Sequence, residues 1–126
     1  MGGGQTFSID RFARLCRIVG TGMWTAADAR RHFAEIELAL RPLRETGRPI
    51  TFLIDMRGAA VQPRETALAM GEGAACLHRE TDIVAVVTGS VLHAMQVKAH
   101  SKVHCLETFQ CMEEAESWMA EQRQTA

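Results

Sequence analysis

Short apolar runs alternate with longer amphipathic segments along this chain. One such run is Pro49–Met56, where five of eight side chains are apolar, with Gly47 before it and Gly58 after it. A run of this kind between turn residues is typical of a strand that is covered on both faces, so we expect it to form the central strand. Ile83–Val87 has the same character and predicts a second buried strand.

The remaining elements follow from shorter patterns. Thr6–Ile9 and Arg14–Val19 lie a few residues apart and predict an antiparallel hairpin at one edge of a sheet. Gly20-Thr21-Gly22 is expected to turn the chain, and residues 57–62 are expected to form a loop. A last strand is predicted at residues 103–108, and helices are predicted at residues 26–41, 63–79, 91–99 and 111–121.

The first helix has the clearest signals. Thr25 with Asp28 three residues later has the spacing of a capping box. Pro42 should kink or end the helix, because it has no N–H to donate to the carbonyl four residues back. Five apolar residues at spacings of three and four share one face, namely Ala29, Phe33, Ile36, Leu40 and Leu43.

Strands that alternate with helices in this order indicate βαβ units with right-handed crossovers. We therefore expect an α/β fold: a single domain over residues 1–126, with a mixed, mostly parallel sheet of about five strands, an N-terminal antiparallel hairpin and about four helices. Residues 1–4 are expected to form a disordered tail.

Composition narrows the classes of function. The 126 residues are 47% hydrophobic and 23% charged, with a formal net charge of -1, which gives no electrostatic reason to expect a nucleic acid as partner. No apolar run approaches the roughly 20 residues of a membrane span, and the N-terminus lacks the pattern of a secretory signal. The four cysteines form no C-x-x-C pair, so reduced thiols and a cytoplasmic location are expected.

Candidates for catalysis or metal binding are weak. Cys76 and His78 are two residues apart on a predicted helix and point in different directions. His100 and His104 have metal-ligand spacing, but the predicted helix ends before His104. His32 and His93 are expected to be surface residues or to have hydrogen-bond partners. The sequence therefore predicts no enzyme, no cofactor and no metal site.

The expected C-terminal edge of the parallel strands gathers most of the remaining polar candidates, because ligands and partners meet open α/β sheets there. Asp55, Arg57 and Gly58 follow one strand, Thr88, Gly89 and Ser90 follow the next, and Gln110 follows the last. Ser90 would either cap the following helix or leave N–H groups free for an anion. Asp55 would cap a loop or face a partner, and Arg57 would be solvated or contact an acidic partner.

Several segments match one known family. They are Gly22-Met23-Trp24-Thr25 at the start of the first helix, Phe52-Leu53-Ile54-Asp55, Val84-Ala85-Val86-Val87, and Phe109 with Glu114-Ala115 and Trp118-Met119. With this order of elements the chain resembles the STAS-like (SpoIIAA-like) domains. These include the anti-sigma-factor antagonists and a related group that shares its fold with the lipid-transfer SEC14 domain.

The resemblance implies a regulatory binding domain, with one departure. Antagonists of this family carry a phosphorylatable Ser or Thr just after the Asp that ends the central strand. Here that place reads Asp55-Met56-Arg57-Gly58, which has no hydroxyl. A switch driven by a kinase is therefore not expected at this position, whereas the binding surface itself is still expected.

Two hypotheses of function follow. In the first, the chain is a non-enzymatic module that binds a protein partner, or a second copy of itself, through Asp55, Met56, Arg57, Gly58, Thr88 and Ser90. In the second, an apolar pocket between sheet and helices binds a lipid-like small molecule, as the SEC14 resemblance implies. A tightly packed interior would exclude the second hypothesis, and a cavity of several hundred Å³ would support it.

Overall fold

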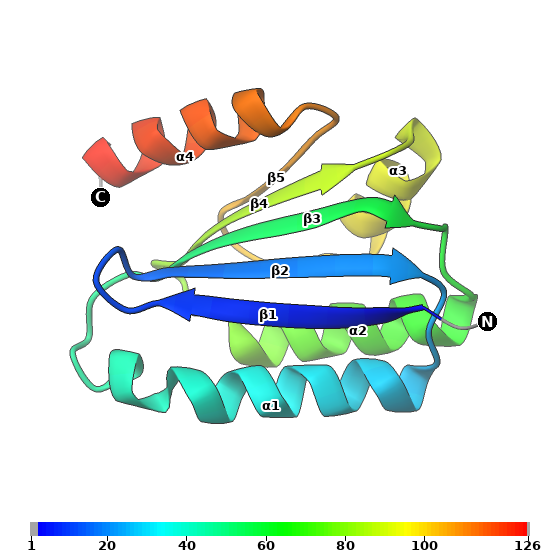
Figure 1. Cartoon of the computed structure of the whole chain (residues 1–126), viewed down its shortest axis with the longest axis horizontal. Coiled ribbons are helices and arrows are strands. Elements are labelled where there is room, and N and C mark those ends of the chain that lie inside the picture. Colours follow the sequence, from blue (N-terminus) through cyan, green and yellow to red (C-terminus); the bar gives the residue numbers. More distant parts are fainter. Residues whose placement is uncertain (1–2, 126) are drawn as a thin grey trace.

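One five-stranded sheet runs through the molecule, with its strands in the order β1-β2-β3-β4-β5 (Figure 1). The computed structural model describes residues 3–125. β1 is antiparallel to β2, and every other neighbouring pair is parallel, which confirms the predicted mixed sheet with an N-terminal hairpin. The strands are β1 (Gly4–Asp10), β2 (Leu15–Gly22), β3 (Thr51–Ala59), β4 (Ile83–Thr88) and β5 (Leu106–Phe109).

The helices lie on both faces of this sheet, but unequally. They are α1 (Ala26–Arg44), α2 (Arg64–Leu77), α3 (Val91–His100) and α4 (Met112–Thr125). Because β2 to β5 follow one another across the sheet and crossovers are right-handed, the three connecting helices must lie on the same face. Figure 1 shows α1 and α2 beneath the sheet, with α4 alone on the opposite face.

The two central strands are buried on both sides. Phe52 is 0% exposed on the face covered by α1 and α2, and its neighbour Leu53 is 3% exposed on the face covered by α4. All six residues of β4 are buried. The prediction of a central strand covered on both faces is thus confirmed, with Ile54 half-buried.

α4 covers the hairpin side of the sheet only near the β1–β2 turn. It packs against β3, β4 and β5, the buried Leu15 at the start of β2 belongs to the same hydrophobic cluster as Met119, and Arg123 donates to the carbonyl of Ala13. Beyond Leu15 the outward side chains of β1 and β2 are exposed and, apart from Val19, polar, and they alternate with mostly apolar inward residues in the pattern of a sheet with one solvated face. The exposed polar positions are Thr6, Ser8, Asp10, Arg17 and Thr21.

The strands extend further than the sequence pattern predicts. Residues 20–22, expected to be a turn, belong to β2, and residues 57–59, expected to be a loop, belong to β3. The two extensions pair with each other as Thr21↔Gly58 and Gly22↔Ala59. Pairing along the parallel ladder supplies hydrogen bonds that override the local turn preference of glycine.

The starts of β1 and β5 also differ from expectation. Gly4 begins β1, and the N–H of Gly3 donates to the carbonyl of Met23 at 2.7 Å, so this part of the predicted tail is paired. Residues 1 and 2 of that tail lie outside the described residues. The predicted last strand is shorter and begins at Leu106, because residues 103–105 make no ladder with β4.

α1 does not end at Pro42 but continues to Arg44. The missing donor of a proline removes one hydrogen bond, and near a helix end the remaining backbone bonds are enough to complete the turn. The N–H of Glu45 still donates to the carbonyl of Arg41 at 3.2 Å. This last turn carries Arg44 to the loop before β4.

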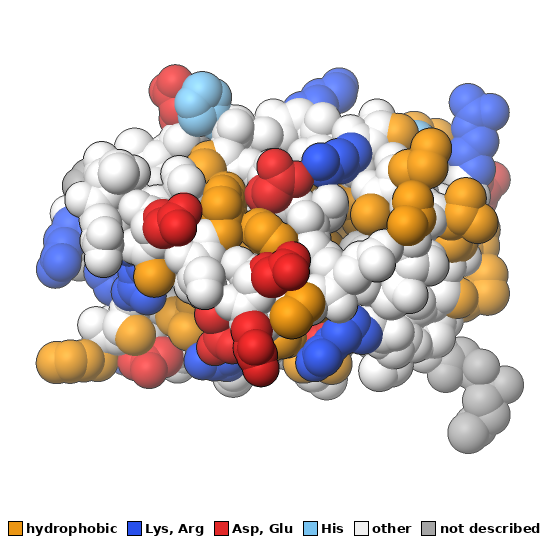
Figure 2. Space-filling model, turned by 90° about the horizontal axis from the view of Figure 1, so that it is seen from above, with side chains coloured by type: hydrophobic (Ala, Val, Ile, Leu, Met, Phe, Trp, Pro, Cys, Tyr) orange, Lys and Arg blue, Asp and Glu red, His pale blue; other side chains and the backbone are white. Residues whose placement is uncertain are grey.

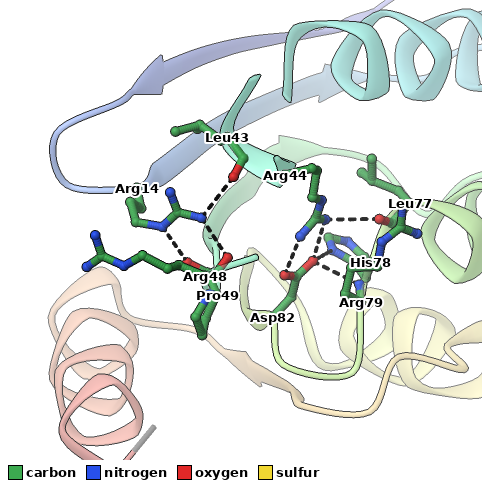
Figure 3. A network of polar contacts seen from close by, with 9 residues as sticks. All are labelled: Arg14, Leu43, Arg44, Arg48, Pro49, Leu77, His78, Arg79 and Asp82. Atoms are coloured by element: carbon green, nitrogen blue, oxygen red, sulfur yellow. Dashed lines mark hydrogen bonds and ion pairs between the residues drawn. The ribbon is translucent and has the colours of Figure 1, made fainter. Parts of the chain in front are cut away.

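Arg44 forms a buried ion pair there (Figure 3). Its two terminal nitrogens donate to the two carboxylate oxygens of Asp82 at 2.7 and 2.6 Å, and one of them also donates to the carbonyl of Leu77 at 3.0 Å. The Asp82 side chain is 0% exposed, and it accepts a third bond from the backbone N–H of Arg79 at 3.0 Å. The pair therefore joins the C-terminal ends of α1 and α2 to the start of β4.

Hydrogen bonding sets the charge state of Asp82. Burial raises its pKa, but the bonds from Arg44, the nearby His78 ring and the N–H of Arg79 together lower it more, so the pKa lies well below the ordinary value of an aspartate. The His78 Nδ1 lies 3.5 Å from the carboxylate.

A second arginine closes the same end of the sheet. Arg14 lies in the β1–β2 turn at φ 54, and its guanidinium donates to the carbonyls of Pro49 at 2.9 Å, Leu43 at 3.2 Å and Arg48 at 2.6 Å (Figure 3). These carbonyls belong to the end of α1 and the loop that follows it. Arg14 thus holds the hairpin against the segment that enters β3.

The ion pair gives a first prediction. Arg44→Met should lower the free energy of unfolding by about 3 to 5 kcal/mol, because it leaves the buried Asp82 carboxylate without its countercharge. The matched control Arg41→Met, which removes an exposed arginine from the same helix, should change stability by no more than about 0.5 kcal/mol. Urea unfolding followed by circular dichroism measures both, and equal effects would contradict a structural role for the pair.

His32 gives a second prediction, which concerns pH. Its ring is 7% exposed and packs edge-on against Phe7 and Phe33 at centroid distances of 6.2 and 5.5 Å. Burial lowers the pKa of His32 to about 4. Below about pH 6.5 the unfolded chain therefore binds a proton that the folded chain does not bind until about pH 4.

The free energy of unfolding should consequently fall as the pH falls from about 6.5 to about 4, and His32 should contribute at most about 1.4 kcal/mol per pH unit to that slope. In His32→Leu the slope should be shallower by this amount. Urea unfolding at half-unit pH intervals measures the difference between the two proteins. Equal slopes would mean that the His32 ring is protonated in the folded chain.

Candidate functional site

The C-terminal edge of the sheet brings the predicted residues of β3 close to those that follow β4. Asp55 and Arg57 are two residues apart on β3 and point to the same face. The Arg57 guanidinium donates from Nε to Oδ1 of Asp55 at 3.0 Å and from a terminal nitrogen to Oδ2 at 2.9 Å. These hydrogen bonds hold the pKa of Asp55 below its usual range and raise the pKa of Arg57.

This ion pair changes the interpretation of Arg57. The sequence suggested a free cation for an acidic partner, but the charge of Arg57 is compensated within its own strand. The arginine side chain is 50% exposed and that of Asp55 is 23% exposed, so the pair faces solvent with little net charge. It therefore offers hydrogen-bonding groups rather than a positive site.

Two of the predicted contact residues are buried. Met56 is 4% exposed and points toward α1 and α2, away from the Asp55–Arg57 pair. Thr88 is 0% exposed, and its hydroxyl donates to the carbonyl of Ser90 at 3.2 Å. Both were expected at the binding surface. The strand alternation that exposes Arg57 turns Met56 inward, and the paired end of β4 encloses Thr88.

The β4–α3 turn lies directly against the end of β3. A Cβ at Gly89 would lie 2.8 Å from the carbonyl oxygen of Arg57, so only glycine allows this approach. The Ser90 hydroxyl accepts from the N–H of His93 at 3.1 Å, which is the N-cap alternative that the sequence left open. Exposed parts of this edge are therefore Arg57, Gly58, Gly89 and Ser90, with Gln110 exposed after β5.

α3 adds an apolar surface that the sequence did not predict. Val91, Leu92 and Met95 are 62%, 70% and 62% exposed. In the sequence they are indistinguishable from a stripe that faces the core, because spacings of one, three and four fit either face of a short helix. In Figure 2 hydrophobic side chains gather at the end of the molecule where α3 lies in Figure 1.

A cavity of about 100 Å³ lies on the other side of α3, between this helix, α1, α2 and the inner face of the sheet. Its walls are mainly apolar, and histidines from three helices also line it: His32, His78, His93 and His100. His93 is 4% exposed and its Nδ1 has no hydrogen-bond partner. The expectation that His32 and His93 are surface residues or hydrogen-bonded is therefore wrong, because the topology places both against the sheet.

Within residues 3–125, no group of three or more His, Cys, Asp or Glu side chains is arranged to hold a metal ion. α3 ends at His100 and His104 lies outside it, so this pair lacks the geometry of a helical metal site. Among the same residues, none of the helices combines the length and apolar character that a membrane span requires.

Comparison with known proteins identifies the fold. The chain matches no family model and no curated protein. It is similar to the crystal structure of an uncharacterised protein of the DUF3478 family, with a SpoIIAA-like fold, from Shewanella loihica PV-4. The TM-score is 0.68 at 18% sequence identity, over 92% of this chain and 94% of that chain. The protein described here therefore has a SpoIIAA-like, that is STAS-like, fold.

Proposed function

We propose that the chain is a non-enzymatic binding module that docks a protein partner at the C-terminal edge of its sheet. The docking surface consists of Arg57, Gly58, Gly89, Ser90 and the outward face of α3. It combines apolar side chains with a hydrogen-bonding ion pair. Ser90 and Gly89 connect the two parts, because the turn that they form abuts the end of β3.

One observation carries this proposal. Three large apolar side chains on the ten-residue helix α3 are each more than 60% exposed. Scattered apolar residues are normal on a surface, but a contiguous group of this kind rimmed by polar residues is characteristic of a protein interface. Lys98, one turn after Met95 on the same helix, supplies a polar edge to this group, and its Nζ lies 2.8 Å from Glu107.

The cavity supports a protein partner over a lipid. Ligand sites for molecules of drug size or larger have volumes of about 300 to 1,000 Å³. The cavity between sheet and helices measures about 100 Å³, which is too small for a lipid chain without a large movement of α3. The position after Asp55 also offers no hydroxyl, so the proposed interaction does not use phosphorylation at that place.

Leu92→Asp should abolish the capture of a partner. A carboxylate at the centre of a desolvated apolar contact loses both the contact and its hydration, so affinity should fall at least about tenfold. The measurement uses the tagged chain to capture proteins from the source organism, with quantitative mass spectrometry, followed by titration calorimetry with the partner identified. Sedimentation of the purified chain tests separately whether that partner is a second copy.

Leu38→Asp provides the matched control. Leu38 is 61% exposed on α1, a helix that contributes no residue to the docking surface, so this variant changes the same chemistry at another place. It should capture the same partner as the unaltered chain. Loss of capture in both variants, or in neither, would contradict the docking surface.

Arg57→Glu tests the polar part of the same surface. It replaces the ion pair by two neighbouring carboxylates, and partner affinity should fall about tenfold while the fold is kept, because the side chain is 50% exposed. Arg30→Glu, an exposed arginine of α1, is the control for charge alone. Unchanged affinity of Arg57→Glu for the identified partner would remove β3 from the proposed surface.

A further inference from the structure

The cavity behind α3 contains hydrogen-bonding groups that have no partner. In the described part of the chain, five buried side-chain nitrogen or oxygen atoms lack a hydrogen bond, and they belong to Gln5, Trp24, His78 and His93. All four residues line this one cavity. Buried polar groups in folded proteins are almost always paired, so the concentration of unpaired groups at one place requires an explanation.

His78 is explained by its surroundings. Its Nδ1 lies 3.5 Å from the Asp82 carboxylate, and its ring packs edge-on against Phe52 at 4.3 Å between centroids. This nitrogen therefore faces the Arg44–Asp82 ion pair. The Gln5 amide, the Trp24 indole N–H and Nδ1 of His93 remain.

Two of these groups meet at one end of the cavity. Gln5 lies directly opposite Gly20 in the β1–β2 register, so its side chain projects from the same face of the sheet at that point. Gly20 has no side chain, and the Trp24 ring occupies the space above it, 3.1 Å from where a Cβ would stand. Met56 fills the rest of that space. The Gln5 side chain and the Trp24 ring therefore lie side by side above Gly20, and together they supply two kinds of donor and one acceptor to the cavity wall.

Other glutamines in the same wall show that pairing is available where the fold needs it. The amide of Gln62 donates to the carbonyls of Gly22 at 2.9 Å and Ala60 at 2.7 Å. The amide of Gln96 donates to the carbonyl of Gln62 at 2.8 Å and accepts from its N–H at 3.0 Å. The unpaired Gln5 amide is thus an exception within its own cavity wall.

The cavity also excludes charge. None of the described residues that line it is Asp, Glu, Lys or Arg. Burial lowers the pKa of His32 to about 4 and also lowers the pKa of His93, so both rings are neutral at pH 7. An ion placed here would lose its hydration without meeting a countercharge. Any molecule that binds at this place is therefore neutral.

We propose that the cavity is a binding site for a small neutral amphiphile that carries one hydroxyl group. The hydroxyl oxygen accepts from the Trp24 indole N–H, and its hydrogen is donated to the Gln5 amide oxygen. The apolar part lies against Ile18, Val86 and Val97. A cavity of 150 Å³ is known to hold benzene, so a volume of about 100 Å³ with the adaptable Met56 and Met70 in its wall limits the ligand to about six or seven heavy atoms.

Three probes of similar size test the ring, the hydroxyl and the absence of charge separately. Phenol supplies a ring and a hydroxyl, benzene the ring alone, and N-methylpyridinium a ring of the same size with a permanent charge. The indole N–H resonance of Trp24 in proton–nitrogen correlation spectra at pH 7 reports binding at the site, and Trp118→Phe assigns it, because the chain has two tryptophans. Phenol should shift this resonance saturably, benzene should bind about 3- to 10-fold more weakly, and N-methylpyridinium at least about tenfold more weakly.

Two variants test the assigned residues. Gln5→Leu should lower the phenol-to-benzene affinity ratio, since it removes the acceptor of the hydroxyl hydrogen, keeps the side-chain volume and leaves the Trp24 N–H in place. Ala74→Leu should weaken both probes at least about tenfold by filling the cavity, whereas Ala75→Leu, at an exposed neighbouring position, should not. Circular dichroism checks that each variant is folded, and the three-probe comparison on the unaltered chain needs no variant.

Three outcomes would overturn the proposal: no saturable shift of the Trp24 resonance with phenol, N-methylpyridinium binding as tightly as phenol, or an unchanged affinity ratio in Gln5→Leu. The first outcome would assign the unpaired groups to ordered water. This test is independent of the proposed docking function, because it uses no partner and alters no residue of the docking surface.

Discussion

The handedness of the crossover connections is the constraint on which the rest of this structure depends. A right-twisted strand, a helix and a parallel strand pack together in only one hand. Since β2 to β5 follow one another across the sheet without reversal, this rule sends α1, α2 and α3 to the same face. The opposite face is left to α4, which contacts the hairpin only near the β1–β2 turn. One face of the sheet is therefore covered by three helices, whereas the other is partly exposed to solvent.

The face covered by α1, α2 and α3 contains both the buried Arg44–Asp82 ion pair and the buried polar groups that lack a hydrogen bond. At the N-terminal end of the parallel strands, Arg44 reaches the fully buried Asp82 only because α1 continues past Pro42. Further along the same face three helices meet the sheet and leave a cavity of about 100 Å³ with unpaired polar atoms in its wall. The ion pair joins α1 and α2 to the sheet, and the cavity is the proposed site for a small ligand.

α3 separates the two proposed binding regions. Its inner side contributes His93 and Gln96 to the cavity wall, and its outer side presents Val91, Leu92 and Met95 to solvent. The outer group is the apolar part of the proposed docking surface. Because the cavity is lined with neutral residues only, its proposed ligand is a small neutral molecule, whereas the proposed partner of the outer surface is a protein.

The sequence determined the order of the elements, the buried central strands and the capping of α1, because hydrophobic periodicity and turn chemistry are local properties. It also placed Asp55, Arg57 and Ser90 at one edge, since parallel strands end together. It could not show that Arg57 pairs with Asp55, that Met56 and Thr88 point inward, or that α3 exposes its apolar stripe. Nor could it show that Gln5 lies beside Trp24 over Gly20. These features arise from strand register and helix packing between distant segments, and only the tertiary structure fixes them.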